Sequence, residues 1–98
     1  MRPPRAADDP YSFWGADVLH DFLARHQGPA HTEVRDLVVR WLFYVLMHDP
    51  RAIESTSVPG EELAVFAWVP ETDVAVSWEV LEAIHTVAVF EIRGLYEI

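Results

Sequence analysis

The sequence predicts an α+β domain in which two helices pack on one face of a small antiparallel sheet. Residues 73–93 hold two runs rich in valine and aromatic side chains, separated by a short polar break, which is typical of an antiparallel hairpin. Residues 15–48 instead repeat their apolar side chains at steps of three and four, which is the period of amphipathic helices. These two patterns together indicate one layer of helices on one layer of sheet.

The hairpin pattern also predicts which strand residues face the helices. In the first run, valines and Trp78 alternate with Ala75, Ser77 and Glu79, which is the two-residue period of a strand. We expect three register pairs that leave one face wholly apolar: Val80 with Thr86, Val76 with Phe90, and Val74 with Ile92. A slip of one residue would turn the apolar set toward the other face.

The helices are expected over residues 15–26 and 29–48. Between Trp41 and Met47 the second segment is apolar on all sides, so we expect it to be the central core helix. Its apolar stripe consists of Val34, Leu37, Val38, Trp41, Val45 and His48. We expect the sheet to pack on this stripe, with Val74, Val76, Trp78, Phe90 and Ile92 against Leu37, Trp41 and Val45.

The remaining segments complete a single domain over residues 11–98. Residues 1–10 contain three prolines and no apolar period, which predicts a flexible N-terminal arm. Residues 51–60 form a polar connection, and residues 61–69 form a further strand. Both faces of that strand are apolar, so its inward face is undecided.

The composition narrows the classes of function. Sixteen acidic residues against seven arginines and no lysine give a formal charge of −9, which disfavours direct binding to nucleic acid. The chain has no cysteine, which excludes disulfides, thiolate metal sites and a cysteine nucleophile. No apolar run is long enough to span a membrane, and no secretory signal is recognisable. We therefore expect a cytoplasmic protein without a cofactor.

The second face of the hairpin is the candidate binding surface. The expected register gives it an apolar strip with a charged rim, formed by Ser77, Glu79, Leu81, Val87, Val89, Glu91 and Arg93. Such a patch is typical of a protein interface, and its acidic rim would select a basic partner segment. A homodimer through the same face is equally allowed. Glu79 and Glu91 are also a weaker candidate for an acid–base pair.

Two further groups of residues have alternative interpretations. Asp17, His20 and Asp21 follow one another at helical steps and are candidate metal ligands, although a solvated helix face explains them better. Of the four tryptophans, only Trp14 and Trp68 are candidates for exposure, where they would favour a protein interface.

From the first helix to the end, the chain resembles the RelE/ParE toxin superfamily of bacterial type II toxin–antitoxin systems. The resemblance covers roughly residues 15–98 and depends on three segments: His48-Asp49-Pro50-Arg51, Val74-Ala75-Val76-Ser77-Trp78-Glu79-Val80, and Thr86-Val87-Ala88-Val89-Phe90-Glu91-Ile92-Arg93. It implies a short first strand, two helices on one face of an antiparallel sheet, and an open concave face opposite.

The resemblance also implies a set of possible functions. Members that cleave mRNA on the ribosome carry basic residues and a C-terminal tyrosine on the concave face, where Arg93 and Tyr96 are the matching residues here. Ala75 stands where the family has an arginine. We therefore expect a divergent member that acts through protein–protein binding, with nuclease activity lost or altered. The alternatives are an active mRNA-cleaving toxin and an acidic, immunity-type inhibitor that covers a basic target surface.

Overall fold

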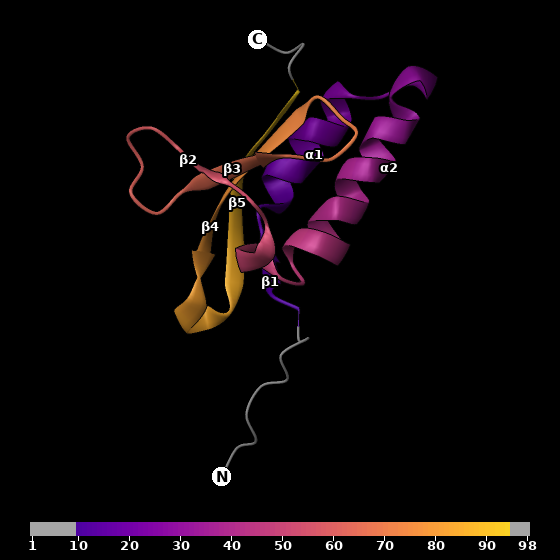
Figure 1. Cartoon of the computed structure of the whole chain (residues 1–98). Helices are drawn as coiled ribbons and strands as arrows, with labels where there is room; N and C mark the ends of the chain where they lie inside the picture. Colours follow the sequence, from indigo (N-terminus) through magenta and orange to yellow (C-terminus); the bar gives the residue numbers. More distant parts are fainter. Residues whose placement is uncertain (1–9, 95–98) are drawn as a thin grey trace.

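The computed structural model describes residues 10–94 of the 98-residue chain (Figure 1). The arm expected at the N-terminus therefore lies outside the described residues, apart from Pro10. The two α-helices are α1 (Ala16–Arg25) and α2 (Thr32–Arg40), and a π-helical segment (Trp41–Leu46) continues α2. The strands are β1 (Ser12–Trp14), β2 (Thr56–Ser57), β3 (Val65–Trp68), β4 (Val74–Leu81) and β5 (Thr86–Gly94).

The described strands form one sheet in the order β1-β5-β4-β3-β2. Helices α1 and α2 lie on the same side of this sheet, which confirms the predicted α+β layers (Figure 1). The sheet is larger than expected and mixed, because β1 pairs in parallel with the start of β5 while all other neighbours are antiparallel. The N-terminal strand is thus held by the last strand of the described chain.

The second helix changes its pitch at Trp41. The backbone N–H of Met47 donates to the carbonyl oxygen of Leu42 at 2.9 Å, a bond that spans five residues as in a π-helix. Side chains five apart therefore share a face, and Trp41, Leu42, Leu46 and Met47 are all buried. Val45 is 43% exposed, so its expected place in the core is wrong: the extra residue in the turn rotates it outward.

The β4–β5 register also differs from the expected one. A short 3₁₀ turn shifts the first pairs to Leu81–Thr86 and Trp78–Val89, and a bulge then gives Ser77–Glu91. Phe90 is left without a partner on β4 at this bulge and is 47% exposed, so its expected packing in the core is wrong.

The same shift reverses the expected faces of Val87 and Val89. Both lie on the face of β5 that the helices cover, and they are 0% and 3% exposed. Their predicted place in the binding patch is therefore wrong. Beyond the bulge the even-numbered residues of β5 face the helices instead of the odd-numbered ones. Ile92 therefore pairs with Val76 and is buried as expected, although in a different register.

Strand β3 resolves the face that the sequence left undecided. Val65 and Ala67 pair with Trp78 and Val76 and share their face, so they point toward the helices. Phe66 and Trp68 consequently point the other way. The inward side already holds two indole rings, which leaves room there for small side chains such as Ala67, 8% exposed.

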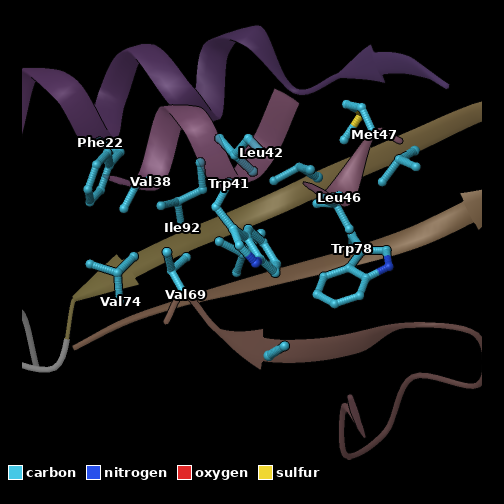
Figure 2. Close-up of a cluster of buried hydrophobic side chains, with 14 residues drawn as sticks. Phe22, Val38, Trp41, Leu42, Leu46, Met47, Val69, Val74, Trp78 and Ile92 are labelled. Carbon is cyan, nitrogen blue, oxygen red and sulfur yellow. The ribbon is translucent and has the colours of Figure 1, made fainter. Parts of the chain in front are cut away.

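The core fills the space between the helices and the sheet (Figure 2). At its centre the rings of Trp41 and Trp78 meet edge to face, with their centroids 6.0 Å apart. The predicted burial of both tryptophans is confirmed, at 7% and 1% exposed. Phe22 of α1 and Ile92 of β5 close the same cluster, and both are buried.

Gly15 joins β1 to α1 at a close approach to the backbone of β5. Its φ angle is +140°, a conformation that side chains with a Cβ rarely adopt. A Cβ at this position would also overlap the backbone carbonyl oxygen of Val89. Glycine therefore allows α1 to start directly against the sheet.

Replacing Trp41 by alanine should lower the free energy of unfolding by about 3–5 kcal/mol, because a large buried aromatic site is emptied. Chemical denaturation would measure the loss. Tyr44→Ala is the matched control, since Tyr44 lies on the same π-helical segment but is 77% exposed, and should change stability by no more than about 0.5 kcal/mol. Equal losses in the two variants would contradict the proposed core.

Gly15→Ala should destabilise the fold by about 2 kcal/mol or more, because the added Cβ meets backbone as well as an unfavourable φ. Gly28→Ala is the control: its φ is +105°, yet a Cβ there meets nothing within 4 Å, so only the conformational cost of about 1 kcal/mol applies. The difference between the two melting curves measures the close approach to Val89. A Gly15 variant as stable as the Gly28 variant would show that this approach is not tight.

Candidate functional site

The face of the sheet opposite the helices, here called the open face, is not covered by any element within residues 10–94. The register defines three rows of side chains that run across its strands. The rows are Trp14–Ala88–Glu79, Phe66–Ser77–Glu91 and Trp68–Ala75–Arg93. Each row thus has a large aromatic side chain on β1 or β3, a small residue in the middle and a charged residue at the other end.

Trp14 and Trp68 are the most exposed large apolar side chains of the open face, at 63% and 51%. Their predicted exposure is confirmed. They lie three strand spacings and four residues apart, which corresponds to a separation of about 20 Å. Between them Ala75, Ser77 and Ala88 carry small side chains, so a bound backbone could approach the sheet closely there.

Five of the seven residues predicted for the binding patch lie on the open face. Glu91 and Arg93 are exposed, Glu79 and Leu81 are half-buried, and Ser77 is buried at 9%. Val87 and Val89 are absent from it for the reason given above, and Tyr96 lies outside the described residues. The apolar character of the face therefore comes from aromatic residues, not from the expected valine strip.

Phe66 was missed as a site residue, and Trp68 was proposed only as a candidate for exposure, because the strand that carries them is apolar on both faces. The signal that could have placed them is the size difference along β3: small Ala67 alternates with two large rings. A face already occupied by Trp41 and Trp78 accepts the smaller set. Phe90 was missed because alternation cannot reveal a bulge.

A pocket of about 510 Å³ borders the open face between α1 and β5. Its lining residues are Asp17, Val18, Asp21, Arg25, Phe90, Glu91, Ile92 and Arg93. Within it, Arg25 forms an ion pair with Asp21 at 3.2 Å, and its Nη2 donates to the backbone carbonyl oxygen of Ile92 at 3.2 Å. The pocket combines an apolar floor with charges of both signs.

A separate polar cluster joins the start of β1 to the turn between β4 and β5. The hydroxyl of Tyr11 donates to Oε1 of Glu82 at 2.7 Å, and Arg51 pairs with the same carboxylate at 3.2 Å. The ring of Tyr11 stacks on His85, with centroids 3.7 Å apart. The hydrogen bond from Tyr11 is the largest cause that lowers the pKa of Glu82, and Arg51 adds to it. The same hydrogen bond, with burial, raises the pKa of Tyr11.

Neither a metal site nor a membrane helix is found in the part of the chain that the structure describes. Among residues 10–94, no three histidine or acidic side chains lie close enough together to hold a metal ion. Asp17, His20 and Asp21 are all exposed on α1, as expected of a solvated helix face. None of the described helices has the length and apolar character needed to cross a bilayer.

The chain was compared with protein-family models, with curated proteins and with solved structures, and none of them matches it. Its function must therefore be inferred from its own residues.

Tyr11→Phe should raise the pKa of Glu82 toward the ordinary carboxyl value, because the largest cause of its depression is removed. The lowered pKa contributes stability that is fully present above the unfolded-state pKa and is lost as the pH falls through the folded-state value. Carboxyl-carbon NMR titration of both proteins would measure the shift. An unchanged Glu82 titration would contradict the hydrogen bond.

Proposed function

We propose that this chain is a RelE/ParE-like small bacterial protein that acts by binding another protein through the open face. The observation that carries this proposal is the exposure of Trp14 and Trp68 on a sheet face that no described element covers. Tryptophan is the residue type most enriched among those that dominate binding energy at protein interfaces. Exposed large apolar side chains gathered on one face are typical of interaction sites.

The charge of the chain supports a basic partner segment. Glu79 and Glu91 lie on the same open face as Arg93, and the whole chain has a formal charge of −9. A basic segment would be attracted at long range and then held by the aromatic residues at the two ends of the face. An antitoxin-like protein and a basic effector both fit this chemistry.

The arrangement of layers supports the family resemblance. Two helices on one face, a short first strand and an uncovered face opposite are what the resemblance implies, although β1 makes the sheet mixed. Binding is favoured over RNA cleavage because a developing phosphate charge needs several cations. In the described part of the open face, Arg93 shares the surface with Glu79 and Glu91, and Ala75 pairs with it where the family has an arginine.

Two alternative functions can be tested by experiment. An active mRNA-cleaving toxin would use Arg93, which is exposed on the open face, and Tyr96. An acidic inhibitor of the immunity type is favoured by the charge of −9 and would cover a basic surface on its target. A neighbouring antitoxin gene would favour a toxin-family protein, and a neighbouring gene for a basic effector would favour the inhibitor.

Partner capture tests the proposal. The full chain would be immobilised, partners from the encoding organism identified by mass spectrometry, and the affinity of the purified partner measured by calorimetry. Trp68→Ser should raise its dissociation constant about 30-fold, because an exposed aromatic anchor is lost. Trp14→Ser should act in the same direction. Tyr44→Ser is the control, since Tyr44 is more exposed than either tryptophan but lies on the helical side.

Two outcomes would contradict binding through the open face. One is a partner whose affinity falls in Tyr44→Ser but not in the tryptophan variants. The other is strong growth arrest on expression in a bacterial host, with cleaved mRNA on the ribosomes, that disappears in Arg93→Ala. The second result would restore the active-toxin alternative.

A further inference from the structure

A pocket of about 280 Å³ lies between residues 50–55 and the strands β3 and β4. Ile53, Val65, Trp78 and Val80 give it apolar walls. Leu63 also lines it and is 70% exposed, so the pocket is open to solvent on that side. Because Val65 and Trp78 are paired on the inward face of the sheet, the pocket lies on the side opposite the open face. A molecule bound here would leave the open face free.

The indole N–H of Trp78 is a donor without an acceptor. Trp78 is 1% exposed, and among residues 10–94 no acceptor lies within hydrogen-bond distance of its ring nitrogen. Every side-chain nitrogen or oxygen that is fully shut off from solvent in those residues has a partner, so this nitrogen belongs to the small part of Trp78 that solvent still reaches. That part lies in the pocket that Trp78 lines. Since a buried tryptophan normally finds a partner for its N–H, the pocket presents an unused donor.

The other polar groups of the pocket favour an anion. Arg51 and Ser55 line it, and none of the acidic residues that the structure describes does so. The hydroxyl of Ser55 has no hydrogen-bond partner among residues 10–94 and is a further available donor. In a chain whose formal charge is −9, a pocket lined by a cation and by no acid attracts a negatively charged ligand.

Arg51 can hold a second carboxylate in addition to that of Glu82. Its Nε donates to Oε1 of Glu82 at 3.2 Å, and its Nη2 lies 3.2 Å from the same oxygen. A guanidinium has five N–H donors, so this pair leaves Nη1 unused by any described residue. The Arg51 side chain is 62% exposed and that of Glu82 is 51% exposed, so water competes for the pair and the guanidinium can turn toward a ligand.

We propose that this pocket binds a small apolar carboxylic acid in its ionised form. The carboxylate accepts hydrogen bonds from the indole N–H of Trp78 and from Arg51, and the apolar body packs against Ile53, Val65 and Val80. The volume lies just below the usual range of ligand pockets, about 300–1,000 Å³, so the ligand is smaller than most drug-sized molecules. This site goes beyond the partner binding proposed above, because it uses other residues on the other side of the sheet.

Titration of the full, ¹⁵N-labelled chain with phenylacetate, followed by NMR, tests the proposal. The indole N–H signal of Trp78 should move in a saturable way, because its proton gains an acceptor. The signals of Trp14 and Trp68 should stay in place, since both rings lie on the other face. For a ligand of about ten non-hydrogen atoms, the dissociation constant should be on the order of 1 mM. Phenylacetamide has the same size without the charge and should bind about tenfold more weakly.

Arg51→Gln should raise the dissociation constant for phenylacetate about tenfold, because the charged donor is lost. Arg40→Gln is the matched control. Arg40 also forms an exposed ion pair, with Asp36 at 3.1 Å, but it does not line this pocket. The control should therefore leave the dissociation constant within about twofold of the parent value.

A Trp78 signal that does not move at about 10 mM phenylacetate would overturn the proposal, as would equal movement of the indole signals on both faces. Phenylacetamide that binds as tightly as phenylacetate would rule out the carboxylate, and so would an Arg51→Gln chain that behaves like Arg40→Gln. Partner capture is measured separately and depends on Trp68, so either result can fail without the other.

Discussion

The edge-to-face contact between Trp41 and Trp78 joins the two layers of this domain at their centre. One indole belongs to the helical layer and the other to β4, and both are almost completely buried. Aromatic rings of this size contribute much of the buried apolar area in a chain of fewer than one hundred residues. The rest of the inward face, with Val76, Ala67 and Val89, is shaped by the space that these rings leave.

Two one-residue irregularities fit the layers around that contact. In the helical layer, the π-helical turn after Trp41 brings Leu46 and Met47 back over the sheet. In the sheet, the bulge at Phe90 lets both Val89 and Ile92 face the helices although they are three residues apart. A regular helix and a regular strand would each turn one of these side chains into solvent. The two irregularities therefore have the same effect on opposite sides of the core.

These irregularities also mark how far the sequence could predict the structure. The α+β class, the helix over residues 15–26, the hairpin and the burial of Trp41 and Trp78 followed from apolar periods that are long and unambiguous. The sequence does not show which side chains of the segments Trp41–Met47 and Val87–Phe90 face the core. Every residue in these segments is apolar, so each choice of inward face would bury apolar side chains equally well. The two-residue alternation placed Glu79, Glu91 and Arg93 on the open face correctly, and the cost of burying an unpaired charge agrees with that placement. Val87 and Val89 are uncharged, so no charge-burial cost indicates which face of the sheet they occupy.

The parallel pairing of β1 with β5 affects the protein while it is being synthesised. The residues that Ser12 and Trp14 pair with, Thr86 and Ala88, are translated more than seventy positions later. Throughout that interval the nascent chain carries an unpaired aromatic segment that has no partner strand. The backbone bond from Ser12 to His85 closes only when nearly all of the sheet has emerged. Contacts of such long range form slowly, so the pairing of β1 with β5 is expected among the last steps in the assembly of the sheet.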